Sequence, residues 1–112
     1  MKFKIKDSKG ISVIELEGNV MGGPDATELN DELHKLITTG KSKVVVDLGS
    51  VKFMNSSGLG MLIRALTTVR NAGGDMKLAR ASEKIESLLV VTKLITVFDH
   101  HESVEKAVQS FS

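Results

Sequence analysis

A run of β-branched and apolar residues near the middle of the chain constrains the fold most. Residues 43–48, with the sequence KVVVDL, lack the polar alternation of a strand that has one face in water. This composition is typical of a central strand that is covered on both faces. Such a strand needs neighbouring strands at its edges and a layer of helices packed on it, so the sequence predicts an α/β fold.

The segments on either side of this run have the periodicity of amphipathic helices. Across residues 26–37, apolar side chains recur mainly at three- and four-residue steps, and Gly40 ends the pattern. Residues 59–69 show the same spacing and are followed by a glycine pair. A strand is predicted at residues 75–79. The order strand, helix, strand implies a right-handed crossover between parallel strands.

Shorter elements are predicted at both ends of the chain. Residues 3–5 and 11–16 have strand patterns separated by a turn-forming cluster, which predicts a β-hairpin. Further on, Ser82 is a favourable N-cap for a short helix, residues 95–98 have the composition of a last strand, and residues 104–111 show a helical apolar face. The expected architecture is one domain with a mixed β-sheet of about five strands and about four α-helices in packed layers.

The charge balance and the missing residue types narrow the classes of partner and chemistry. Fifteen basic and fourteen acidic residues give a formal net charge of +1, so a nucleic acid partner is not expected. No apolar run approaches the roughly 20 residues of a spanning helix, so direct membrane insertion is not expected either. The chain has no cysteine, which favours a cytoplasmic location. No cofactor is expected, because the sequence has neither a phosphate loop nor a dinucleotide fingerprint.

Small and polar residues gather just before the second helix. Residues 51–60, VKFMNSSGLG, lie in a connection that is expected to be a loop of roughly eight to ten residues. A helix N-terminus presents unpaired backbone N–H groups and the positive end of the helix dipole. An Asn or Ser side chain can cap these groups, and a phosphoryl group can use them. Gly58 and Gly60 leave this first turn open to another protein.

Residues 47–60, DLGSVKFMNSSGLG, resemble the signature of the STAS domain found in bacterial anti-anti-sigma factors. The resemblance extends over the whole chain in the order of its elements. It implies that Ser56, the first serine of the pair, is phosphorylated by an anti-sigma factor that is itself an ATP-dependent serine kinase. It also implies that the unphosphorylated domain binds this kinase and so releases a sigma factor, and that a serine phosphatase resets the cycle. The domain is expected to be a monomer when alone.

The same resemblance implies a partner surface made of two segments. One is the loop before the first helix and the other is the start of the second helix, and their residues are Asn19, Met21, Gly22, Gly23, Pro24, Asp25, Asn55, Ser56, Ser57, Gly58 and Leu59. Family members with this cycle usually carry aspartate where this chain has Asn55, and often acidic residues where it has Asn19 and Met21. The neutral residues remove negative charge near Ser56, so a phosphoryl group there meets less repulsion.

Each of these features also has a purely structural interpretation. Ser56 suits a helix cap without any regulatory role, and Ser57 suits a share in that cap or modification in place of Ser56. Residues 22–24 suit an ordinary turn between a strand and a helix. Asp25 and Asp47 are lone carboxylates, for which a capping or solvated role is expected.

Enzymatic and metal-binding functions have weaker support in the sequence. Ser56 and Ser57 lack the Gly-x-Ser-x-Gly elbow of a hydrolase nucleophile, so enzyme activity is not expected. His100 and His101 are adjacent in a segment expected to be extended, and their opposite directions disfavour a shared metal ion. A second function class stays open, because a fold does not fix its use: a STAS scaffold in a stress-signalling or transporter complex, without a sigma-factor partner.

Overall fold

The strand at the middle of the sheet is β3, Lys43–Met54. In the computed structural model, which describes residues 1–111, the three consecutive valines of β3 have no exposed surface. β2, Ile11–Val20, and β4, Asp75–Ala79, pair with β3 on its two edges, and both run parallel to it. The prediction of a buried central strand with parallel neighbours is therefore confirmed.

The outer strands complete a mixed sheet. β1, Lys2–Ser8, forms an antiparallel hairpin with β2, as the sequence predicts. β5, Asp99–His101, adds to the other side and runs parallel to β4. The strand order in space, β1-β2-β3-β4-β5, is the same as the order in the sequence. Residues 1–111 thus form five strands and four α-helices, which matches the expected architecture.

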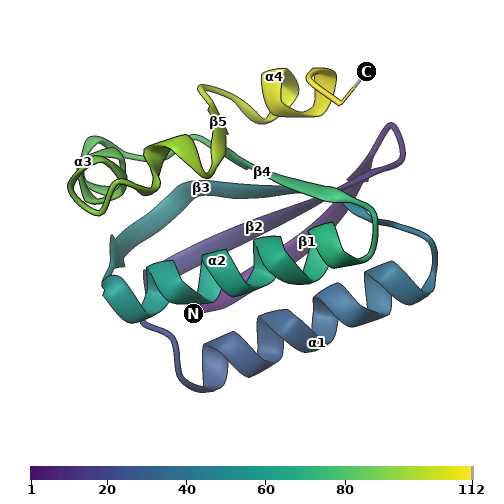
Figure 1. Ribbon diagram of the computed structural model, residues 1–112, viewed down its shortest axis with the longest axis horizontal. Helices are drawn as coiled ribbons and strands as arrows, with labels where there is room; N and C mark the ends of the chain where they lie inside the picture. The colour runs from purple at the N-terminus through teal and green to yellow at the C-terminus, as the bar shows by residue number, and fades with distance from the viewer. Residues whose placement is uncertain (112) are drawn as a thin grey trace.

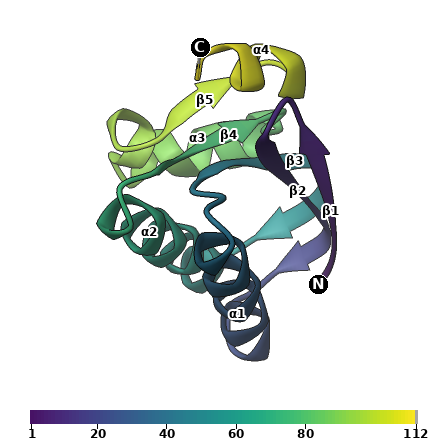
Figure 2. The same cartoon turned by 90° about the vertical axis from the view of Figure 1, so that its right-hand side faces the viewer.

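Two long helices cover one face of the sheet. α1, Pro24–Thr38, and α2, Ser56–Asn71, lie side by side on this face, and the shorter α4, Val104–Gln109, lies on the opposite face (Figure 1, Figure 2). The alternation of β3 explains both layers, since Val44 and Val46 pack in the core under α1 and α2, whereas Val45 packs with α4. The largest fully buried side chains of the main core include Ile14, Leu16, Leu29, Leu33, Leu62 and Leu78.

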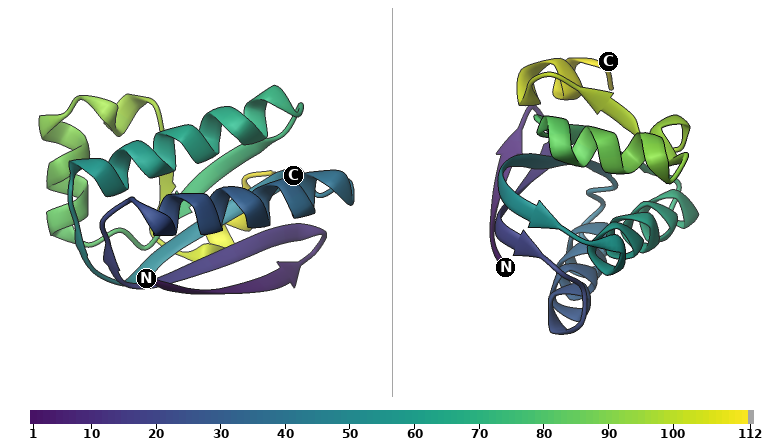
Figure 3. Two further views of the ribbon diagram at one scale, coloured as in Figure 1. Left: turned by 90° about the horizontal axis from the view of Figure 1, so that it is seen from below. Right: turned by 90° about the vertical axis from the view of Figure 1, so that its left-hand side faces the viewer.

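Two further helical segments lie beyond the carboxyl end of β3. α3, Glu83–Val91, and the 3₁₀ helix η1, Leu94–Thr96, sit at one end of the sheet (Figure 1, Figure 3). The predicted N-cap is confirmed, because the hydroxyl of Ser82 accepts a hydrogen bond from the N–H of Ile85 at 3.3 Å. Across residues 1–111, no helix combines the length and the apolar character that crossing a bilayer requires.

β3 is longer than the sequence pattern indicates. The apolar run ends at Leu48, and the sequence predicts a loop of eight to ten residues after it. The strand instead continues to Met54, and only Asn55 separates it from α2. The reason is that β2 continues beside it, with Asn19 opposite Phe53 after two shifts of register. These irregularities explain why residues 49–54 lack the period-two pattern of a regular strand.

The prediction of a last strand at residues 95–98 is wrong. This segment begins in η1, after Lys93 in a left-handed conformation with φ of 62°, and the strand forms at Asp99–His101 instead. Phe98 is buried, while Ile95 and Val97 are each 37% exposed. The β-branched residues therefore form a connection that is held by one aromatic side chain, and β-propensity is overridden by packing.

Candidate functional site

The first turn of α2 is attached directly to the carboxyl end of the sheet. Asn55 is the single residue between β3 and α2, and its N–H donates a hydrogen bond to the carbonyl oxygen of Val20, the last residue of β2, at 3.4 Å. The loop between β2 and α1 starts at the same place, so this loop and the start of α2 share one end of the molecule (Figure 1). Two strand ends therefore fix the position of the helix start.

Asn55 is the N-cap of α2. Its backbone is extended, with φ of −99° and ψ of −178°, and its side-chain oxygen accepts a hydrogen bond from the N–H of Gly58 at 2.8 Å. The interpretation of Ser56 as the capping residue is therefore wrong, because Asn55 occupies that position. Ser56 is the first residue of the helix, and both Ser56 and Ser57 are exposed.

Glycine at position 58 permits the close contact between α2 and β2. A Cβ atom added at Gly58 would lie 2.0 Å from the carbonyl oxygen of Val20. Gly22, with φ of +83°, makes a second close approach, since a Cβ atom there would lie 3.1 Å from the Cβ of Ser57. A Cβ at Gly60 would meet no heavy atom within 4 Å, so this side of the first turn is open.

The structure brings the two predicted segments of the partner surface together, but their residues differ in exposure. Asn19, Met21, Gly23, Pro24, Ser56 and Ser57 are exposed, and Asn55 is partly buried. Met21 is 46% exposed, which agrees with an apolar contact residue. Leu59 is only 2% exposed and belongs to the core, so its side chain does not reach the surface as the prediction requires. Gly22 and Gly58 are buried as well and contribute through the backbone they allow.

Asp25 points toward the N-terminus of the chain. It lies in the first turn of α1, where a carboxylate interacts favourably with the helix dipole. One of its oxygens is 3.5 Å from the amino group of Met1. Asp25 remains partly exposed, so its place in the predicted partner surface stays a prediction.

The start of α2 carries no titratable side chain. Residues 55–61 have the sequence NSSGLGM, and the first turn contains no acidic residue. The two hydroxyls therefore have no general base within their own turn, as a nucleophile would need. What the turn offers is an exposed hydroxyl at the positive end of a helix of 16 residues.

Asp47 and Arg80 form an ion pair that the sequence did not reveal. The side chain of Asp47 is 4% exposed, and Arg80 donates to it through Nε at 2.8 Å and through Nη2 at 2.7 Å. The N–H of Gly49 donates to the same carboxylate at 3.0 Å. The hydrogen bonds that Arg80 donates to the carboxylate of Asp47 raise the pKa of Arg80. The expectation of a capping or solvated role for Asp47 is wrong, because its carboxylate is buried and paired with Arg80. The lone acid in an apolar run was the available signal that a charged partner was needed.

Other polar groups do not assemble into a second site. His100 accepts a hydrogen bond from the N–H of Ala81 through Nε2 at 3.1 Å, and His101 Nε2 lies 3.1 Å from an oxygen of Asp99. Within residues 1–111, no group of three or more His, Cys, Asp or Glu side chains is placed to hold a metal ion.

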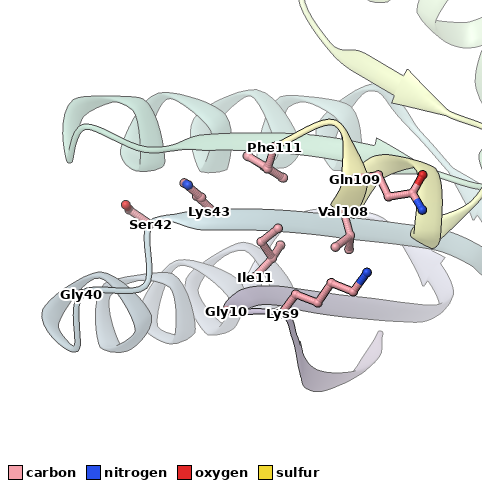
Figure 4. Close-up of a pocket in the computed structure, with 9 residues that line it drawn as sticks. All are labelled: Lys9, Gly10, Ile11, Gly40, Ser42, Lys43, Val108, Gln109 and Phe111. Carbon is pink, nitrogen blue, oxygen red and sulfur yellow. The ribbon is translucent and has the colours of Figure 1, made fainter.

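A cavity of about 450 Å³ lies near the amino end of β3, the opposite end from Ser56. Lys9, Lys43 and Gln109 are its longest polar side chains, and they do not converge on a common point (Figure 4). Phe111 and Val108 form part of its apolar lining. The cavity therefore lacks the convergent polar groups of a ligand site.

The comparisons with known proteins agree with this fold. The model of the STAS domain matches residues 2–107. The anti-sigma-B factor antagonist of Bacillus subtilis is 30% identical over 98 residues, which are 85% of this chain and 89% of that protein. An anti-sigma factor antagonist from Mycobacterium paratuberculosis has a crystal structure that matches with a TM-score of 0.81 and 19% identity, over 97% of this chain and 92% of the other.

A further solved structure is that of the Bacillus cell fate determinant SpoIIAA in the phosphorylated form. It matches with a TM-score of 0.74 and 17% identity, over 99% of this chain and 100% of the other. The resemblance seen in residues 47–60 is thus confirmed along nearly the whole length of the protein. The chain belongs to the STAS domain family.

Proposed function

We propose that this protein is an anti-sigma factor antagonist that is switched by phosphorylation of Ser56. The observation that carries the proposal is the place of Ser56, exposed as the first residue of α2 and beside the loop between β2 and α1. The relatives named above as anti-sigma factor antagonists support the coarse function. The protein acts by binding, and its unphosphorylated form binds an anti-sigma factor and so releases a sigma factor.

The modification is a phosphoryl transfer from ATP. The anti-sigma factor acts as the kinase, the oxygen of Ser56 bonds to the γ-phosphorus, the bond to the bridging oxygen of ADP breaks, and the hydroxyl proton leaves to solvent or to a base of the kinase. A serine phosphatase reverses the state by transferring the phosphoryl group to water. The proposal thus has two protein partners, a serine kinase and a serine phosphatase.

Charge explains how this modification would act as a switch. A phosphoserine carries about −1.5 to −2 charges at neutral pH. In the free domain, the N-terminal dipole of α2 and the absence of acidic residues from its first turn make this charge tolerable. In a packed interface the same charge would have to lose its hydration and meet the groups that fit a neutral hydroxyl, so the complex would be weakened.

The test is the binding of purified anti-sigma factors from the source organism to matched variants. Ser56→Ala should bind like the original protein, and Ser56→Asp should bind at least about tenfold more weakly, which corresponds to about 1.4 kcal/mol. Thr67→Asp is the control, because it places the same charge on an exposed position of α2 about 16 Å farther along the helix axis. Equal binding of Ser56→Asp and Ser56→Ala would exclude the switch.

Incubation with the bound anti-sigma factor and ATP checks the chemistry separately. Phosphate should appear on the tryptic peptide that spans residues 53–64 and should be localised to Ser56. The Ser56→Ala variant should stay unmodified. If no anti-sigma factor binds the unphosphorylated protein, the sigma-factor function fails, and the alternative of a STAS scaffold gains support.

A further inference from the structure

An apolar groove opens next to the start of α2. It has a volume of about 310 Å³ and lies between the end of β3 and α3, lined by Lys52, Phe53, Met54, Ile85, Leu88 and Val91, with Lys84 and Ser87 completing its wall. Met54 is separated from Ser56 only by Asn55. Figure 3 shows α3 beside the carboxyl end of β3, where α2 begins. The groove and the candidate site therefore share one end of the molecule.

The groove is open because the sheet is incomplete at this point. β4 pairs with β3 only as far as Ala79 opposite Asp47, so the last part of β3 has no strand neighbour on that side. α3 stands there instead, and turns one side toward the groove with Lys84, Leu88 and Val91 at helical spacing. The wall formed by β3 thus faces a helix across a gap.

Large apolar side chains on both walls are exposed to solvent. Phe53 is 51% exposed and Val91 is 79% exposed. A hollow that is flanked by large exposed apolar groups is characteristic of a protein interaction site. In such a hollow, an aromatic side chain is typically one of the residues that contribute most to the binding free energy.

The charges at the groove select the chemistry of its occupant. Lys52 and Lys84 are exposed lining residues, one on each wall, and no acidic residue lines the groove. An apolar side chain that enters between Phe53 and Val91 would therefore be best accompanied by carboxylates that face the two lysines. A basic or purely polar segment does not fit this combination.

An interface of ordinary size that covers Ser56 must also cover neighbouring surface. A stable protein interface covers about 800 Å² on each partner and about 20–30 residues. The exposed residues of the start of α2 and of the neighbouring loop are far fewer than that. A partner that covers Ser56 must extend over adjoining surface, and the groove is adjoining surface of the right apolar character.

We infer that this groove is a second contact surface for the anti-sigma factor and receives an apolar segment flanked by acidic residues. The inference rests on the proposed function and adds the chemistry of the partner segment. Ser56 would then control the complex by charge, and the groove would supply affinity that does not depend on the serine.

The test measures the affinity of an anti-sigma factor for groove variants by titration calorimetry. Phe53→Ser should weaken binding at least about tenfold, through loss of buried apolar area. The double variant Lys52→Glu/Lys84→Glu should weaken binding by a similar factor and should reduce the dependence of the affinity on salt. Ile5→Ser is the matched control, because Ile5 is 38% exposed on β1, an edge strand that does not line the groove.

The outcomes separate the groove from the switch. Thermal melts of all variants should stay close to that of the original protein, since Lys52, Lys84 and Phe53 are exposed. If both groove variants bind within twofold of the original while Ser56→Asp loses binding, the groove inference is overturned and the switch stands. If the groove variants lose binding while Ser56→Asp does not, the groove stands and the switch falls. If the unmodified protein binds no anti-sigma factor, both fall together.

Discussion

Two glycines in the first turns of α2 have opposite surroundings. Gly58 packs against the backbone of Val20, where a Cβ atom would be 2.0 Å from the carbonyl oxygen. Gly60 has nothing within 4 Å of the same virtual atom. The first glycine is required by the contact between α2 and β2, and the second only makes the helix more flexible and its surface more open.

Alanine substitutions at these two positions should therefore have opposite effects. Gly58→Ala should lower the free energy of unfolding by about 2–3 kcal/mol, because the added methyl group displaces a backbone segment. Gly60→Ala should raise it by about 0.5–1 kcal/mol, because alanine in a helix loses less conformational entropy on folding. Urea denaturation of the two variants checks this, and effects of equal sign would contradict the contact seen at Gly58.

Local sequence could not decide which residue caps α2. Asn55, Ser56 and Ser57 are all favourable N-cap residues. The choice depends on where β3 ends, since the helix begins as soon as the strand stops pairing with β2. The pairing partner of β3 lies far away in the sequence, so the capping register is a tertiary property.

At the scale of elements, the ion pair of Asp47 and Arg80 joins β3 to the end of β4. Arg80 has a left-handed backbone with φ of 57°, and its guanidinium lies over Gly49, where a Cβ atom would be 2.3 Å from Cζ. The two partners differ in burial, since the side chain of Asp47 is 4% exposed and that of Arg80 is 45% exposed. Removing Asp47 and removing Arg80 should therefore lower the free energy of unfolding by different amounts.

Removal of the arginine should destabilise the fold more than neutralisation of the aspartate. Arg80→Ala leaves a buried carboxylate with only the N–H of Gly49 and should cost about 2–3 kcal/mol, below the value for a fully buried pair because Arg80 is half-exposed. Asp47→Asn should cost about 1–2 kcal/mol, because the arginine can turn to water. The double variant Asp47→Asn/Arg80→Ala should be more stable than Arg80→Ala alone. Chemical denaturation of the three variants measures this order of stability. A double variant that is less stable than Arg80→Ala would contradict the cost assigned to the unpaired carboxylate.

The last strand is held to β4 by charge as well as by backbone pairing. Lys77 lies opposite Asp99 in the register, and its Nζ is 2.7 Å from a carboxylate oxygen of Asp99. The hydrogen bond from Lys77 lowers the pKa of Asp99 below its ordinary value, with a smaller contribution from His101. The polar composition of residues 99–101 carries no strand signal, whereas the apolar residues 95–98 before them do, although they form no strand.

This contact makes a prediction about acid stability. Because the pKa of Asp99 is lower in the folded state, its stabilisation is fully present above the unfolded pKa of about 3.9 and is lost as the pH falls through the folded pKa. Melting temperatures between pH 7 and pH 2 should therefore fall less steeply for Asp99→Asn than for the original protein below about pH 4. Parallel curves for the two proteins would show that Asp99 contributes nothing to the acid response.

At the scale of the whole molecule, the layers were predictable and the groove was not. The valine run, the two amphipathic helices and the hairpin each carry a strong periodic signal, and together they specify a mixed sheet with helices on it. The groove lies between α3 and the unpaired end of β3. The relative position of these two elements is a tertiary property that no local sequence pattern indicates. Phe53 and Val91 are far apart in the sequence, and only the tertiary fold places them on opposite walls of the groove.

The order of the strands has a consequence for how the protein is made. Because β1 to β5 are neighbours in space in the same order as in the chain, each new strand adds to an edge that already exists. No strand has to enter between two that are already paired, and each closing segment stays short. The sheet can therefore grow in the direction in which the ribosome extends the chain, with the serine-bearing helix emerging after the strand pair that fixes its start.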